Sequence, residues 1–188
     1  MGYFHIMSLD NDRLMIGLAA ILAKSPNATY LEIAERIGVS RATLYRFCGN
    51  REELIHRILK YAATKLTENI QAIRLEDGHP IEALNRLLES ELKDRPLHSF
   101  LSEFWSSSHE LNSELLPTVL TYEKVLDNFF LRGQREGVFR IDIPAAVLNE
   151  NLTWLLIGLM DAERRGRIAR ASVLETAKLL FLEGAEPH

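Results

Sequence analysis

The chain has 188 residues, of which 47% are hydrophobic and 26% charged, and its formal net charge is −4. This is the composition of a globular protein with a sizeable core, and it excludes a disordered or low-complexity chain. The single cysteine, Cys48, excludes an internal disulfide, and no segment has the form of a signal peptide or an apolar run long enough to span a bilayer, so we expect a cytoplasmic protein.

The apolar periodicity and the breaks between periodic segments predict helices from end to end, with no internal repeat and no strand-rich region. Cap residues such as Asp10 or Asn11 open the early helices, and prolines, Pro117 among them, open most of the later ones. A short extended link is expected at 138–143. The predicted helices span about 11–24, 29–38, 41–47, 50–74, 80–93, 96–109, 117–136, 144–165 and 171–183.

Residues 29–60 carry the pattern of a helix-turn-helix, in which two short helices are joined by a tight turn and run into a third. Ala34 lies where two crossing helices must approach closely, and Gly38 lies where the chain must turn with a positive φ. Thr29 and Glu32 form a capping box, and Leu44 is expected in the core. Apolar residues fall at the required offsets: Ile33, Ile37, Val39, Leu44 and Phe47.

Positive charge is concentrated in this part of an otherwise acidic chain. Residues 1–60 contain eight Lys and Arg against six Asp and Glu, whereas the remainder contains fourteen against twenty. A phosphate backbone attracts a local excess of cations, so the distribution favours DNA binding by the first 60 residues despite the net charge.

The helix at 41–47 is expected to enter the major groove with its N-terminal residues. Arg41 is the first candidate for a base, because arginine can bind guanine O6 and N7 together, and Ala42 could touch a thymine methyl. Thr43 can reach a base or a phosphate. The remaining candidates point toward the backbone or lie at helix openings, where amides help to hold phosphate. They are Thr29, Ser40, Tyr45, Arg46 and Arg51.

Segment 13–60 resembles the DNA-binding head of the tetracycline-repressor (TetR) family of bacterial transcription regulators. The family pattern is roughly I-A-x-x-x-G-V-S-x-x-T-L-Y-x-H-F-x-S-K-E-x-L, and most of its positions are matched from Ile33 to Leu54. The usual His-Phe pair is replaced here by Phe47-Cys48, which leaves open which of the two fills the core. The resemblance implies that Thr43, Tyr45 and Arg51 contact DNA, largely its backbone.

The same resemblance implies an all-α fold of about nine helices. Residues 1–50 would form the helix-turn-helix domain, joined by a long fourth helix to an effector-binding and dimerisation domain at 51–188. The last two helices would pack as a dimeric four-helix bundle, and their apolar stripes are compatible with either a core or an interface. A two-fold dimer expects a palindromic operator.

Helices four to seven would then enclose a small-molecule pocket, and aromatic residues favour an apolar or aromatic effector, although aromatics at helical spacing also form ordinary core. The candidate ligand-binding residues are His98, Leu101, Phe104, Trp105, Tyr122, Phe129 and Trp154. His98, Glu103 and His109 do not share a helix face, so no metal or other cofactor is expected. A buried Cys48 is favoured over a redox switch.

These features favour a dimeric repressor that a small molecule releases from its operator, by binding a second conformation more tightly. The alternative is a DNA-associated accessory protein that uses the same head without an effector. An enzyme is not expected, because the chain has no nucleophile–base pair, no phosphate-binding glycine loop and no metal motif.

Overall fold

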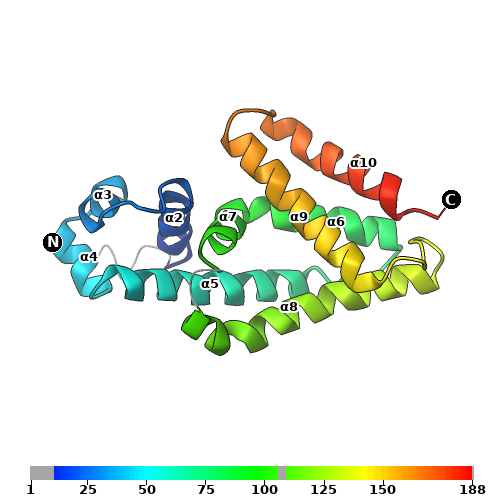
Figure 1. Ribbon diagram of the computed structural model, residues 1–188, viewed down its shortest axis with the longest axis horizontal. Coiled ribbons are helices and arrows are strands. Elements are labelled where there is room, and N and C mark those ends of the chain that lie inside the picture. The colour runs from blue at the N-terminus through cyan, green and yellow to red at the C-terminus, as the bar shows by residue number, and fades with distance from the viewer. Residues whose placement is uncertain (1–10, 106–108, 188) are drawn as a thin grey trace. The chain divides into compact units, whose positions relative to one another are not determined.

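A computed structural model describes residues 11–105 and 109–187, and all regular structure in these residues is helical. The predicted all-α class is therefore confirmed (Figure 1). The α-helices are α2 (Asn11–Lys24), α3 (Tyr30–Arg36), α4 (Arg41–Phe47), α5 (Arg51–Ala72), α6 (Pro80–Lys93), α7 (Arg95–Phe104), α8 (His109–Arg135), α9 (Ala145–Arg164) and α10 (Val173–Ala185), with a short 3-10 helix, η2 (Arg170–Ser172), before the last.

The described residues divide into two compact units. The first contains the described residues of 1–63 and 96–115, and the second contains those of 64–95 and 116–188. Helices α5 and α8 each contribute residues to both units.

In the first unit, α2 packs against α3 and α3 packs against α4, as Figure 1 shows. The buried face of α2 is a stripe of apolar residues at helical spacing: Met15, Leu18, Ala19 and Leu22. On α3 and α4 three of the positions that the motif requires to be apolar or small are also buried: Ile33, Ala34 and Leu44. The other apolar positions of the motif, Ile37, Val39 and Phe47, are half-buried.

In the second unit, α9 and α10 lie side by side and both contact α6 (Figure 1). Its core contains a cluster of four phenylalanines, Phe129, Phe130, Phe139 and Phe181. The ring centroids of Phe130 and Phe139 are 5.4 Å apart, and those of Phe139 and Phe181 are 6.4 Å apart. Aromatic pairs at these separations add to the stability that area burial provides.

The segment at 109–117 differs from the prediction. The sixth predicted helix was expected to continue to His109 and the seventh to begin at Pro117, but α7 ends at Phe104 and Pro117 lies inside α8. Proline removes one backbone donor from a helix, but it does not prevent a helix that other contacts stabilise. Here Leu115 is buried and Glu114 bonds to two side chains of α5, so tertiary contacts favour the helix before the proline.

The link at 138–143 is not extended as predicted but is made largely of bends. Phe139 is completely buried, and the backbone N–H of Arg140 donates to the carbonyl of Ala185 at 2.9 Å. The amide of Gln134 donates to the carbonyls of Arg140 and Ile143 at 2.8 and 2.6 Å. The path of the link is therefore set by the packing of one aromatic ring and by the hydrogen bonds around it. The alternation of apolar and polar residues in the sequence reveals neither.

Candidate nucleic-acid interface

The first helix of the motif opens with the predicted capping box. The Thr29 hydroxyl accepts from the backbone N–H of Glu32 at 3.3 Å, and the Glu32 carboxylate accepts from the backbone N–H of Thr29 at 2.7 Å. The bond from the backbone N–H of Thr29 and a further bond from the Thr29 hydroxyl to the same carboxylate lower the pKa of Glu32. Thr29 is thus an exposed helix cap, and its backbone and side chain are already engaged in the DNA-free head.

Gly38 makes the turn between α3 and α4 with a φ of +76°, as the motif requires. The N–H of Val39 donates to the carbonyl of Ala34 at 2.9 Å and the N–H of Gly38 donates to that of Glu35 at 3.1 Å. This pair of bonds is a Schellman motif, which pairs carbonyls at the end of α3 and directs the chain into the next helix.

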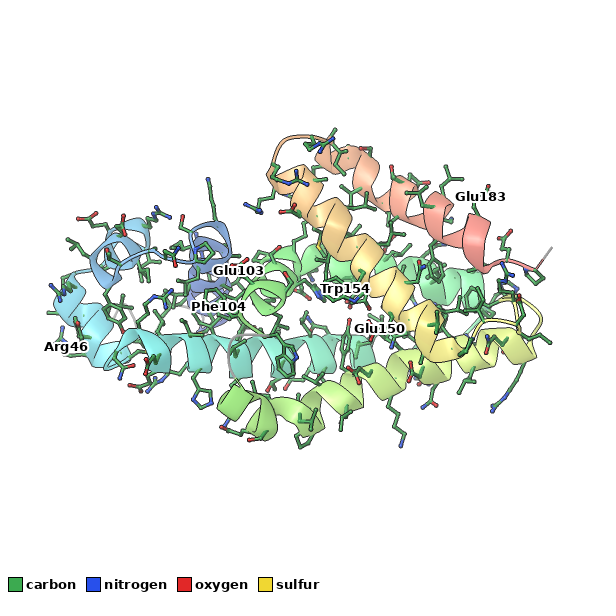
Figure 2. All side chains as sticks on the ribbon, in the orientation of Figure 1. Arg46, Glu103, Phe104, Glu150, Trp154 and Glu183 are labelled. Carbon is green, nitrogen blue, oxygen red and sulfur yellow. The ribbon has the colours of Figure 1, made fainter. Side chains whose placement is uncertain are left out.

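Ser40 caps α4, as predicted, by accepting from the backbone N–H of Thr43 at 3.1 Å. Beyond this cap, α4 presents a polar and cationic surface. Arg46 lies on this helix in Figure 2, and its guanidinium donates to the Thr43 hydroxyl at 3.4 Å. Thr43 is half-buried, and the other candidates on this helix and its cap are exposed: Ser40, Arg41, Ala42, Tyr45 and Arg46.

The choice between Phe47 and Cys48 is decided by burial. Cys48 is 1% exposed, whereas Phe47 is only half-buried and lies beneath the guanidinium of Arg57, whose Cζ is 5.4 Å from the ring centroid. Cys48 therefore fills the core position, and burial raises the pKa of its thiol to about 11. A thiol with so little thiolate at neutral pH does not suit a redox switch.

Helix α5 begins with a third cap, in which the Asn50 side chain accepts from the backbone N–H of Glu53 at 2.8 Å. The Glu53 carboxylate accepts from the N–H of Gly49 at 2.8 Å and from Arg57 at 2.9 Å. The half-buried Arg51 donates to the backbone carbonyl of Pro26, in the turn between α2 and α3. Arg51 thus connects the start of α5 to that turn.

Tyr30 is a residue of this site that the sequence did not single out. Its ring lies 4.6 Å from that of Tyr45, and its hydroxyl donates to the carbonyls of Cys48 and Asn50, the latter at 3.3 Å. Burial raises the pKa of this hydroxyl to about 12, so it remains a donor throughout the physiological range. No local signal marks Tyr30, because its partners are 15 to 20 residues away along the chain.

The candidate ligand-binding residues fall in both units. His98, Leu101, Phe104 and Trp105 belong to the first unit, where His98 and Phe104 are buried. The rings of Phe100 and Phe104 stack with centroids 4.6 Å apart. No group of three or more His, Cys, Asp and Glu side chains able to hold a metal is found within residues 11–105 and 109–187, a search that does not include the side chain of His109.

The other three candidates, Tyr122, Phe129 and Trp154, belong to the second unit and have different environments. The Tyr122 hydroxyl donates to the buried Glu91 carboxylate at 2.7 Å, and burial together with that carboxylate raises its pKa well above the ordinary value. Phe129 lies in the phenylalanine cluster. Trp154 is 62% exposed and donates to Glu150 at 3.0 Å, and Figure 2 shows both on α9.

Solved structures of TetR-type regulators have the same fold as this chain. The transcriptional regulator LfrR of Mycobacterium smegmatis matches with a TM-score of 0.74 and 20% identity over 94% of this chain and 97% of its own. The ketosteroid regulator KstR2 of Mycobacterium tuberculosis matches with a TM-score of 0.73 and 17% identity, over 96% and 97%. At these identities the likeness establishes the fold alone.

A sequence relative decides the family. The HTH-type transcriptional regulator NfxB of Pseudomonas aeruginosa is 43% identical over 175 residues, which cover 93% of this chain and 94% of NfxB. The chain belongs to the TetR family of transcriptional regulators. No protein-family model matches the sequence. The matches to NfxB and to LfrR extend over more than nine-tenths of the chain, whereas the helix-turn-helix motif lies within residues 29–60.

Membership of the TetR family makes the protein a DNA-binding transcription regulator, and its relatives are regulators rather than enzymes. Within the described ranges, no helix is long and apolar enough to cross a membrane.

Proposed function

We propose that this TetR-family regulator is a homodimeric repressor that binds a palindromic operator and is released from it by a small-molecule effector. In this proposal residues 1–50 read DNA, and residues 51–188 bind the effector and form the dimer. The observation that carries the proposal is the exposed surface of α4, which joins Arg41, Ala42 and Tyr45 on a helix capped at Ser40 and supported by a buried Leu44.

Each head residue has a role in this proposal. Arg41 reads a guanine, Ala42 contacts a neighbouring base and Thr43 bonds a base or a phosphate. Tyr45 and Arg46 hold the backbone on one side of α4. Thr29, Ser40 and Arg51 lie at helix openings, where backbone amides and a cation together attract phosphate.

Homodimerisation is supported by large apolar side chains that α9 and α10 leave exposed. Val147 and Trp154 on α9 are 51% and 62% exposed, and their spacing of seven residues places them on one helix face. Leu179 and Leu180 on α10 are 61% and 54% exposed. Monomeric proteins seldom leave so many large apolar groups on neighbouring helices, so a second copy of the chain is the proposed partner of this face.

Control by an effector is supported by the likeness to LfrR, which was solved in complex with proflavine. The proposed ligand is apolar or aromatic, because the candidate ligand-binding residues of each unit, taken separately, are mainly aromatic or aliphatic with a few polar groups. Trp154 was expected in this set, but its exposure on α9 supports the dimer face instead. The effector releases the operator only if it binds the released conformation more tightly.

Selection of bound duplexes from a random DNA pool, at two salt concentrations, tests the proposed function. An enriched inverted repeat with two equal half-sites is the expected result, and it also supplies the probe for an effector screen. Salt-sensitive binding without any enriched sequence would contradict sequence-specific regulation and would favour an accessory DNA-coating protein.

A further inference from the structure

Three side chains of the head form a continuous stack that reaches the surface of α4. The Cζ atom of Arg41 lies 5.3 Å from the ring centroid of Tyr45, and the guanidinium also donates to the Tyr45 hydroxyl at 3.4 Å. The other side of the stack is Tyr30, whose ring centroid is 4.6 Å from that of Tyr45 at an interplanar angle of 48°. The stack therefore connects the first residue of α3 to the first residue of α4.

Burial decreases along this stack. Tyr30 is 8% exposed, Tyr45 is 42% exposed, and Arg41 lies on the open surface. The buried ring is the fixed part of the stack, because the surrounding core encloses it, and its hydroxyl bonds in addition to the carbonyls of Cys48 and Asn50. The ring of Tyr45 packs against the ring of Tyr30, and the guanidinium of Arg41 packs against the ring of Tyr45.

A cation over an aromatic face is attracted by the ring quadrupole, and a long side chain held in this way loses less rotamer freedom when it binds. Arginine has many rotamers on an exposed helix, so an unsupported Arg41 would sample many directions. The two rings restrict these directions before DNA is present.

We propose that Tyr30 is a positioning residue for base readout, which holds the ring of Tyr45 and through it the guanidinium of Arg41. This inference rests on the proposed function, in which Arg41 contacts a base. Tyr30 itself is buried and touches no DNA. Its effect is on the preference for one base in each half-site rather than on the number of phosphate contacts.

The test compares Tyr30→Leu, which removes the ring, with Tyr30→Phe, which keeps the ring but removes the hydroxyl. Base preference is measured by competition among operators that differ only at the base read by Arg41. Tyr30→Leu should reduce this preference about two- to fivefold per half-site, the worth of an exposed cation–ring contact. Tyr30→Phe should retain it, and the salt dependence of binding should stay unchanged in both variants.

A double-mutant cycle separates positioning from a general loss of structure. In an Arg41→Ala background, Tyr30→Leu should cause no further loss of preference at that base, because the group on which it acts is gone. If Tyr30→Leu fails to fold, Tyr45→Leu replaces it in the cycle, since Tyr45 is exposed and its loss breaks the same stack. Unchanged base preference in the folded variant would overturn the proposal.

A measurement on the DNA-free protein distinguishes failure of this inference from failure of the proposed function. Ring currents from Tyr45 should shift the side-chain NMR resonances of Arg41, and Tyr30→Leu should move them toward random-coil positions while Tyr30→Phe should not. If the chemical shifts of the Arg41 side chain are the same in Tyr30→Leu as in the wild type, the positioning role is overturned, whatever DNA the protein binds. Failure of the wild-type chain to select any DNA would instead overturn the proposed function.

Discussion

The ring of Phe139 occupies the space that any side chain at position 133 would need. A Cβ atom built on Gly133 would lie 2.2 Å from Cδ2 of Phe139, a distance that real Cβ atoms do not show. Phe139 is fully buried among Phe129, Phe130 and Phe181, so its ring cannot move aside without disturbing that cluster. A glycine in the last turn of α8 is therefore explained by packing and not by a positive φ.

Gly133→Ala should destabilise the protein by about 1–3 kcal/mol, the usual cost of overpacking a core, despite the better helix propensity of alanine. Denaturant unfolding followed by circular dichroism measures this change. Gly17→Ala in α2 is the matched control, because a Cβ there meets nothing within 4 Å and should stabilise by up to about 1 kcal/mol. Equal effects of the two substitutions would contradict the packing explanation.

Arg41→Ala should cost about 1–3 kcal/mol of operator binding and relax the preference for one base in each half-site. Arg46→Ala, on the same helix, should instead weaken binding to all sequences about equally, because it is proposed to hold the backbone. Competition binding against a set of operator variants measures both. Loss of base preference in Arg46→Ala and not in Arg41→Ala would reverse the proposed docking of α4.

Arg51→Ala should weaken binding to every sequence and reduce the slope of log affinity against log salt by about one per half-site. Its bond to the Pro26 carbonyl is lost as well, so a control must loosen the same turn without removing a proposed phosphate contact. Arg36→Ala serves this purpose, because Arg36 donates to the Ser25 hydroxyl at 2.8 Å. The salt slope should change only in Arg51→Ala, and equal slopes in both variants would argue against the phosphate contact.

Cys48 should react very slowly with thiol reagents in the folded protein. Its pKa of about 11 reduces the thiolate fraction at pH 8 by about a hundredfold relative to an ordinary cysteine, and its burial blocks access in addition. The rate of modification by a disulfide reagent, with and without denaturant, measures the difference. Rapid modification of the native protein would show that the thiol is open to redox chemistry after all.

The same thiol makes stability depend on alkaline pH. The folded pKa of Cys48 lies above the ordinary value of 9.0, so the folded state holds the proton more tightly than the unfolded state. Stability should therefore fall as the pH rises from about 9 to about 11. Cys48→Ala should remove this part of the decline in a series of denaturant titrations, and an unchanged decline would assign it to other groups.

Trp154→Ala should weaken the proposed dimer by about 2 kcal/mol or more, roughly 30-fold in its dissociation constant, because exposed tryptophans on an apolar face are frequent interface anchors. Sedimentation equilibrium measures the change. Leu120→Ala on α8 is the control, since Leu120 is 51% exposed but lies on neither α9 nor α10. An unchanged dimer in Trp154→Ala would remove this residue from the interface.

Local sequence signals predicted the helical elements of the head closely. Thr29 with Glu32, Ser40 and Asn50 cap their helices as expected, because each cap and its partner are only three residues apart. Gly38 adopts its positive φ for an equally local reason. The prediction that a helix begins at Pro117 was wrong. The helix already exists before the proline, where Glu114 bonds to His56 and Lys60, and these partners are more than 50 positions away in the sequence.

The all-α class, the helix-turn-helix and the resemblance to TetR regulators follow from the sequence alone, because caps, glycine turns and helical periodicity depend on residues within one or two turns of each other. The packing of the folded chain was needed to show that Cys48 and not Phe47 enters the core, that Phe139 packs on Gly133, and that Tyr30 lies against Tyr45, which lies against Arg41. Each of these results depends on which side chain fills a space between segments that are separate in the sequence. A pattern of neighbouring residues does not contain this information.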